Sequence, residues 1–527
     1  MVKNNPNKRN LRFLQVIIVL TVTSTLLKLT LIGPGLFANM DEGKYREAEE
    51  VFIGIKKGDM THAMTHLFST EPPQARPGYT LVMTILESAY HGLRHVRDFT
   101  HSRFNIEYGN VSRGYLIFVF NYITLVCILF LLWRLSYGLS SSQIVAWLTV
   151  LIFVSTLYSS LYLRHALPYN LALLINLIIA NTLFFRVSGS RNLTLILAGA
   201  LAGVSFTIYP GYILLSSVIF LSYYIYKRQL LTACTHACIS AVGFLLVIGT
   251  TESIALYTTG ISYLLDSKSL SATITQGNPQ ENLSFIGIYI LNSGVILDIL
   301  LTLLIALAII QIPVQLWKKQ NLNRIQLLGI AILIVLVGYG SIGMITGSLV
   351  YYGRLIYQFL PLLILFGCSS IITSWDNTSS FKAATFFISL MLICSYSTFI
   401  SLTELNQIGY SNDFIQEMLP LAKEEGRAIY YTYETKPIYT TKPTIPIDSI
   451  ELLESPSLVI VNASFFYRRS WEGVETGNIK SELPHLDFIA TRKHYQNSMG
   501  YLMENNSSEF RDFITSWNPQ LYAIRVN

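Results

Sequence analysis

The sequence is poor in charged residues, which make up 13% of its 527 positions, while hydrophobic residues make up 52%. A soluble globular domain carries about 25% charged residues. The shortage of charge therefore excludes an ordinary soluble protein and predicts an integral membrane protein. The formal net charge of +6 is small for this length, and the lysines and arginines form no basic stripe, which argues against a nucleic-acid partner.

The sequence also has few cysteines, and none in its polar regions. All five lie in apolar or nearly apolar stretches: Cys127, Cys234, Cys238, Cys368 and Cys394. A disulfide framework is therefore not expected, and these residues are interpreted as small buried apolar groups. No internal repeat is visible either, which argues against a transporter built from two related halves.

Long apolar stretches fill most of the chain up to residue 403. A helix needs about 20 mostly apolar residues to cross a membrane, and this criterion predicts about eleven spans. Their expected bounds are 11–32, 113–134, 142–163, 168–186, 192–208, 211–227, 231–257, 284–312, 325–349, 353–373 and 381–402. The first stretch is too long for the apolar core of a signal peptide, so we expect it to remain as an uncleaved span.

The distribution of basic residues predicts the orientation of these spans. Lysines and arginines precede the first span and then recur in every second connection, which is typical of cytoplasmic loops. The N-terminus is therefore expected in the cytoplasm, and an odd number of spans places the C-terminal region outside. The loop 33–112 and the tail 404–527 are the two large outer regions. A bacterial plasma membrane is the expected location.

The two outer regions differ in their expected structure. Helical periodicity predicts amphipathic helices at 41–57 and 78–93 in the first outer loop, where they would lie in the membrane interface. The tail alternates strand-like and helical runs, which predicts a small α/β or α+β domain. Its strands are expected at 428–433, 457–461, 487–491 and 521–526, and its helices near 413–425 and 508–516.

The expected fold class is therefore mostly α. Residues 1–403 would form a polytopic bundle of membrane helices, with interfacial helices in its first outer loop. Residues 404–527 would form a separate extracytoplasmic domain.

A pair of acids, Asp41-Glu42, follows the first span and opens the long outer loop, with Tyr45 shortly after it. Ionised carboxylates are costly beside hydrocarbon and usually have a task there. The structural interpretation is that Asp41 caps the next helix and Glu42 lies in its first turn, where acids are favoured. The functional interpretation is compatible with it, because a capping acid can also face a site.

Three arginines lie on the expected outer side, where cations are unusual. They are Arg76 before Pro77, Arg164 beside His165, and Arg354 at the end of a span. Each can be an interface anchor or the partner of an acid. Each can also bind phosphate, because a guanidinium offers a planar fork of hydrogen-bond donors.

A weaker pattern suggests a metal site in the first outer loop. Asp59, His62 and His66 fall on one face of a helix by their spacing, and their side chains are metal ligands. The fourth ligand is undetermined, and the alternative is an ordinary solvated face.

These features, in this order, resemble the GT-C membrane glycosyltransferases. The resemblance is strongest to the branch that contains protein mannosyltransferases and lipid A aminoarabinose transferases, and it covers residues 10–400. In that branch an Asp-Glu-x-x-Tyr-type motif follows the first span, as Asp41-Glu42-x-x-Tyr45 does here. A Lys-Pro-Pro-Leu-Tyr-type motif then opens an interfacial helix, and Arg76-Pro77-Gly78-Tyr79 stands in that place.

Two later basic positions extend the resemblance. Arg164, ahead of Pro168, resembles a basic residue at the turn between the third and fourth spans, and Arg354, ahead of Pro361, resembles a late arginine at an outer helix end. The departures are an arginine in place of the usual lysine at position 76 and a glycine in place of the second proline at position 78.

The resemblance implies transfer of a sugar from a polyprenyl-phosphate-linked donor to a hydroxyl of a glycan, lipid or protein, on the outer membrane face and with inversion. Asp41 would be the general base. Glu42 and Tyr45 would position the acceptor or support the fold.

The resemblance also implies which groups meet the lipid phosphate. Arg76, Arg164 with His165, and Arg354 would bind it, so no cofactor beyond the donor and no essential metal is expected. A metal ion bound by Asp59, His62 and His66 is not excluded. Two rival functions are a transporter or flippase of lipid-linked sugars and a subunit for polysaccharide assembly and export.

Overall fold

A computed structural model describes most of the membrane helices, three helices of the first outer loop and the strands of the C-terminal region. The described residues are 6–31, 46–68, 76–100, 108–163, 167–185, 191–226, 230–268, 296–318, 321–346, 357–375, 380–406, 409–432, 444–445, 450, 453, 456–462, 485–493 and 520–526.

Seven of the described helices are long and apolar enough to cross a membrane. They are α1 (Pro6–Leu31), α5 (Tyr108–Ser140), α9 (Arg191–Ile208), α11 (Leu230–Thr259), α14 (Ile296–Trp317), α15 (Arg324–Thr346) and α18 (Ser380–Asn406). Shorter apolar helices occupy the other expected spans: α6 (Gln143–Ser155), α8 (Tyr169–Phe184), α10 (Ile213–Tyr226) behind the 3-10 turn η2 (Pro210–Tyr212), and α17 (Leu360–Trp375). The expected polytopic helical membrane protein is confirmed, while the orientation in the membrane stays a prediction.

Several helix bounds differ from those expected, including those in three predicted spans. The span predicted at 142–163 is broken, because α6 ends at Ser155 and a separate short helix, α7 (Tyr158–Leu161), follows it. The span predicted at 353–373 contains a helix that begins only at Leu360, with Pro361 in its first turn, where a missing N–H costs nothing. In the span predicted at 284–312, α14 begins at Ile296 and continues to Trp317, and the residues before it lie outside the described ranges.

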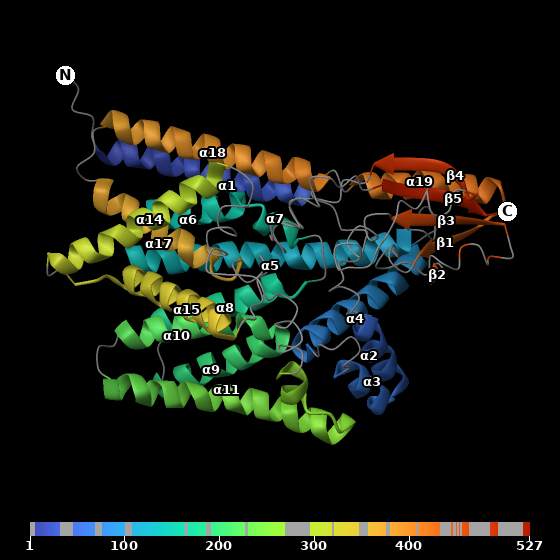
Figure 1. Ribbon diagram of the computed structural model, residues 1–527, viewed down its shortest axis with the longest axis horizontal. Helices are drawn as coiled ribbons and strands as arrows, with labels where there is room; N and C mark the ends of the chain where they lie inside the picture. The colour runs from blue at the N-terminus through green and yellow to red at the C-terminus, as the bar shows by residue number, and fades with distance from the viewer. Residues whose placement is uncertain are drawn as a thin grey trace.

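The described part of the loop 33–112, which is expected on the outer side, includes the helices α2 (Arg46–Lys57), α3 (Met60–Leu67) and α4 (Pro77–Thr100). The helix predicted at 41–57 is thus described from Arg46 onward, and the one predicted at 78–93 is longer than expected. In Figure 1 these helices lie toward the same end of the molecule as the C-terminal sheet, while the apolar helices run along the long axis.

Helices α9 and α11 pack through small residues that let their backbones touch. A Cβ atom on Gly199 would overlap the carbonyl oxygen of Ser240, and one on Gly243 would overlap the carbonyl oxygen of Ile196. Glycines at such positions permit the closest approach of two membrane helices. Gly199 of α9 and Gly243 of α11 therefore form a packing surface between the two helices.

This packing predicts that Gly243→Val will strongly destabilise the protein. Overpacking a tight interface costs about 1–3 kcal/mol or more, because backbone atoms cannot move aside as side chains do. The melting temperature in detergent is the measurement. Gly249→Val on the same helix is the matched control, since a Cβ at Gly249 has no neighbour within 4 Å. Equal melting temperatures for the two variants would contradict this account.

The C-terminal region forms a mixed five-stranded sheet in the order β2-β1-β3-β5-β4. Its strands are β1 (Ala428–Thr432), β2 (Thr444–Ile445), β3 (Ser457–Asn462), β4 (Asp487–Lys493) and β5 (Gln520–Val526). β1 pairs in parallel with β2 and β3, and β5 pairs antiparallel with β3 and β4. The four strands expected from the sequence are confirmed, and the two-residue β2 was not foreseen.

Helix α19 (Gly409–Glu424) lies beside this sheet and confirms the helix expected near 413–425. Leu458 and Ile460 of β3 pack with Ala422 of α19, while Val459 and Val461 pack in a second cluster. Both faces of β3 are therefore covered. The helix predicted near 508–516 lies outside the described residues. Because α18 continues to Asn406, the domain division between residues 403 and 404 stays a prediction.

Candidate functional site

Arg76 lies at the start of α4 and is buried. Its carbonyl oxygen accepts hydrogen bonds from the N–H groups of Tyr79 at 3.0 Å and Thr80 at 2.9 Å, so it begins the helix, with Pro77 as the first helical residue. Its side chain is 7% exposed, and its guanidinium carbon lies 4.7 Å from the centre of the Tyr209 ring. A cation over an aromatic face is attracted by the ring quadrupole.

Gly78 allows α4 to approach the end of α9 closely enough for this contact. A Cβ atom at position 78 would lie 2.5 Å from the Thr207 hydroxyl oxygen and 3.1 Å from the backbone nitrogen of Ile208. A proline, which the family motif has here, would bring such a Cβ. The departure from the motif at this position therefore has a steric reason, and it places Arg76 directly against Tyr209.

Tyr263 is a second buried aromatic residue in the neighbourhood of Arg76. Its side chain is 1% exposed, and its hydroxyl donates to the carbonyl oxygen of Phe206 at 3.5 Å. Burial raises the pKa of Tyr263 far above its usual range, against the opposing effects of a hydrogen bond with Ser267 and of the positive charge of Arg76. Tyr263 is thus a neutral hydrogen-bond donor at ordinary pH.

Tyr209 is the first of a series of five tyrosines whose rings contact one another in succession. We call the five residues Tyr209, Tyr169, Tyr162, Tyr357 and Tyr158 the tyrosine row. Successive ring centres are 5.1, 4.9, 4.8 and 5.8 Å apart, within the range of favourable aromatic pairs. All but Tyr209 are at most 1% exposed. The row connects residues that are nearly 200 positions apart in the sequence, from α7 to the start of α17.

A buried lysine, Lys28, lies at the far end of the tyrosine row. It belongs to α1, is 0% exposed, and donates hydrogen bonds from Nζ to the hydroxyls of Ser159, at 2.9 Å, and Ser160. These serines directly follow Tyr158. Within the described ranges Lys28 has no carboxylate partner, although a buried ammonium normally requires one. The sequence analysis missed it, although a lysine inside an apolar span is itself a signal.

Most of the site residues predicted from the sequence lie outside the described residues. They are Asp41, Glu42, Tyr45, Arg164, His165 and Arg354. Their roles therefore stay predictions. Described residues adjoin two of these positions in the sequence: Leu163 and Leu167 on either side of Arg164 and His165, and Tyr357 after Arg354.

Of the three candidate metal ligands, the structure brings His62 and His66 together, while Asp59 lies at the start of α3. Asp59 caps α3, accepting a hydrogen bond from the N–H of His62 at 2.9 Å, so its carboxylate faces the helix end. Glu50 of α2 takes its place, and one ligand atom from each of Glu50, His62 and His66 lies within 4.8 Å of the others. Glu50 could not be found from the spacing within one helix, because it belongs to α2 whereas His62 and His66 belong to α3.

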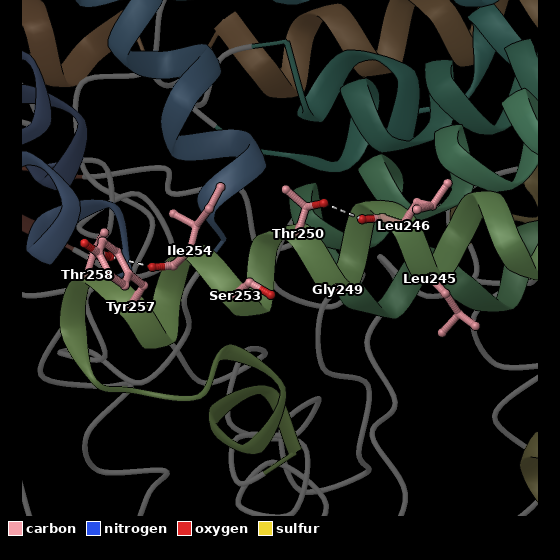
Figure 2. Close-up of a pocket in the computed structure, with 8 residues that line it drawn as sticks. All are labelled: Leu245, Leu246, Gly249, Thr250, Ser253, Ile254, Tyr257 and Thr258. Carbon is pink, nitrogen blue, oxygen red and sulfur yellow. Dashed lines mark hydrogen bonds between the residues drawn. The ribbon is translucent and has the colours of Figure 1, made fainter.

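A hollow on α11 is a different kind of feature. Its eight lining residues all come from that helix, and Figure 2 shows the side chains of Leu245 and Leu246 directed away from one another. Two hydroxyls of the lining donate to carbonyl oxygens of the helix itself, Thr250 to Leu246 and Thr258 to Ile254, both at 2.7 Å. The lining includes no acid, lysine, arginine or histidine. The hollow therefore has no group suited to the reaction expected from the sequence.

The whole fold has counterparts among solved structures. No family profile and no curated protein sequence matches the chain. ArnT from Cupriavidus metallidurans bound to undecaprenyl phosphate is similar over 96% of this chain and 97% of its own, with 10% identity and a TM-score of 0.52. The same protein in its apo state is similar over 98% of both chains, with 9% identity and a TM-score of 0.49.

These findings define the class of the protein by its fold. The chain is a polytopic helical membrane protein that shares its fold with ArnT, and the resemblance inferred from the sequence motifs is thereby confirmed at the level of the fold. ArnT, a solved structure to which the chain is similar, is a lipid A aminoarabinose transferase. At 10% identity the likeness establishes shared architecture, and the chemistry has to be argued from the residues.

Proposed function

We propose that the protein transfers a sugar from a polyprenyl-phosphate-linked donor to an acceptor hydroxyl at the outer membrane surface. The observation that carries this proposal is Arg76, a buried cation at the head of the tyrosine row, in a chain that shares its fold with ArnT over nearly its whole length. The ArnT structure contains undecaprenyl phosphate, which belongs to the class of lipid phosphate that the proposed reaction releases.

Chain connectivity supports a common location for the other candidate cations. In the sequence, Arg164 follows Tyr162 by two positions, and Arg354 precedes Tyr357 by three. The rings of Tyr162 and Tyr357 are 4.8 Å apart. The middle of the tyrosine row is therefore the expected position of the phosphate, with Arg76 on one side.

The proposed chemistry needs one base and several cations. Asp41 accepts the proton of the acceptor hydroxyl while the hydroxyl oxygen attacks the anomeric carbon of the donor sugar. The bond between that carbon and the phosphate oxygen breaks, and the polyprenyl phosphate leaves with the electron pair. Charge on the phosphate grows during this step, so Arg76, Arg164 and Arg354 stabilise the transition state more than the ground state.

The reaction is tested with purified protein in vesicles that contain polyprenyl-phospho-sugars carrying a radiolabelled sugar. A cell-envelope fraction supplies the acceptor. We expect release of free lipid phosphate in step with transfer of the label. Passage of intact lipid-linked sugar across the vesicle membrane, without release of lipid phosphate, would show a transporter and overturn the proposal.

Lys28 yields a further prediction, because it is the described cation at the other end of the tyrosine row. If its ammonium contacts the lipid phosphate, Lys28→Met should raise the KM for the donor about 10- to 100-fold, the value of a lost charge-assisted hydrogen bond. The fold should be kept, since an apolar side chain of similar volume often replaces a buried charge without loss of stability.

The measurement for Lys28→Met is the rate of lipid phosphate release over a range of donor concentrations. Ser24→Ala is the control, since Ser24 lies on the same buried face of α1 and pairs with Thr398 at 3.3 Å. An unchanged KM and kcat in a well-folded Lys28→Met variant would show that Lys28 has only a structural role.

A further inference from the structure

Helices α2 and α3 form a tight antiparallel hairpin in the first outer loop. The turn between them contains Gly58, at a φ of +75°, which is accessible to glycine without strain, and Asp59, which caps α3. A Cβ atom on Gly54 would lie 2.7 Å from the backbone nitrogen of Ala63, so the two helices are in backbone contact. This close packing fixes which side chains of α2 face those of α3.

The facing side chains include two acids and two histidines. Glu47 and Glu50 are one turn apart on α2, and His62 and His66 are one turn apart on α3, so each pair shares a helix face. His62 Nε2 lies 3.1 Å from Glu50 Oε2, and His66 Nδ1 lies 2.6 Å from Glu47 Oε2. The centres of the two imidazole rings are 4.4 Å apart.

From this geometry we infer that Glu50, His62 and His66 bind a divalent transition-metal ion of the zinc class. Their ligand atoms lie within 4.8 Å of one another, so a modest convergence brings all three to about 2.0–2.2 Å from a common centre. Two imidazoles and a carboxylate suit zinc and its neighbours rather than magnesium or calcium, which prefer oxygen ligands.

Glu47 supports the same ion by holding the His66 ring. A carboxylate that accepts the Nδ1–H of a histidine fixes its tautomer and leaves Nε2 with the lone pair that a metal requires. The four side chains are partly exposed, with side-chain exposures of 37% for His62, 43% for Glu50, 30% for His66 and 22% for Glu47. The site is thus open to metal ions from solution, and three protein ligands leave one position for water.

The ion would connect α2 to α3 and so fix a hairpin that directly follows the Asp41-Glu42 segment. Val51, Ala63 and Leu67 of this hairpin pack against Ala255 of α11 and against Tyr263, which lies just beyond that helix. The metal site is separate from the proposed phosphate site, and its existence does not depend on the proposed function.

The test measures metal binding and stability without using enzyme activity. The full-length protein is stripped with a chelator, and Zn²⁺, Co²⁺, Ni²⁺ or Mn²⁺ is added separately. Bound metal per chain is measured by mass spectrometry, and the melting temperature is measured alongside. We expect about one equivalent of at least one of these ions, together with a higher melting temperature, because a ligand that binds only the folded state stabilises it.

The variants assign the ion to its ligands. His62→Ala, His66→Ala and Glu50→Gln should each abolish stoichiometric binding and the thermal shift, and Glu47→Gln should weaken affinity about 10- to 100-fold. His91→Ala is the matched control, since His91 also lies beside a glutamate, Glu87, at 3.2 Å, but belongs to α4 and not to the cluster.

Melting of the variants in chelator guards against misfolding as an explanation. Without metal, His62→Ala and the wild-type protein should melt at similar temperatures, since the His62 side chain is partly exposed. Two results would overturn the inference: no stoichiometric binding of any of the four ions, or equal binding to the wild-type protein and the His62→Ala and His66→Ala variants.

Discussion

The Asp41→Asn variant is expected to release lipid phosphate about 10²- to 10⁴-fold more slowly than the wild-type protein, the usual contribution of a positioned general base. An amide has almost the shape of a carboxylate but cannot take the proton from the acceptor hydroxyl. The affinity for the donor should change little, because in the proposed mechanism the phosphate is bound by cations and not by Asp41. Initial rates of lipid phosphate release at saturating donor are the measurement.

Glu42→Gln is the matched control for this prediction, since it makes the same chemical change at the adjacent residue. It should leave most of the activity, because Glu42 is expected to position the acceptor or to support the helix that follows. Full turnover by Asp41→Asn would show that Asp41 is not the base. A loss with Glu42→Gln and none with Asp41→Asn would exchange their roles.

Arg76→Ala is expected to lower kcat/KM for the donor about 10²- to 10³-fold, comparable with the loss of one donor that stabilises developing charge. The physical reason is that Arg76 is 7% exposed, so its charge acts at short range with little screening by water. Arg76→Lys keeps the charge and should recover part of the loss. Recovery should be incomplete because an ammonium lacks the planar fork of donors.

The contact with Tyr209 provides the control for Arg76, whose guanidinium carbon is 4.7 Å from that ring. Tyr209→Phe keeps the ring and should leave kcat/KM nearly unchanged. Tyr209→Ala removes the surface on which the guanidinium rests and should resemble a mild form of Arg76→Ala. Unchanged donor kinetics in a folded Arg76→Ala variant would rule out a phosphate-binding role, and the residue would then be a packing element of α4.

The sequence predicted the membrane helices well, because a span is marked by its own composition. Boundaries were less predictable where apolar composition continues past the end of a helix. The run 142–163 has no strong breaker, yet α6 ends at Ser155, where the hydroxyl of Thr156 donates to the carbonyl oxygen of Phe153 at 2.7 Å. A local side-chain hydrogen bond of this kind competes with the helix and is weakly encoded.

Residues of the candidate site could be predicted only where the neighbouring sequence makes them unusual. Arg76 is such a residue, since an arginine before a proline and a helix is unusual on the side of the membrane that the sequence predicts to be outer. Lys28 was hidden by the apolar residues around it, and Glu50 was hidden because its histidine partner, His62, is on another helix. Contacts such as Lys28 with Ser159, 131 positions apart, follow from tertiary packing, which a reading of one segment at a time does not reach.

The glycine contacts between α9 and α11 have a mechanical consequence. The backbones of α9 and α11 touch at Gly199 and Gly243. Sliding or rotation of one helix against the other would make backbone atoms overlap, so the pair behaves as one rigid unit. Ala255 of α11 packs against the α2–α3 hairpin, and α9 ends one residue before Tyr209, over whose ring the Arg76 guanidinium lies. The α2–α3 hairpin and the Arg76 side chain are therefore both supported by the same tightly packed helix pair.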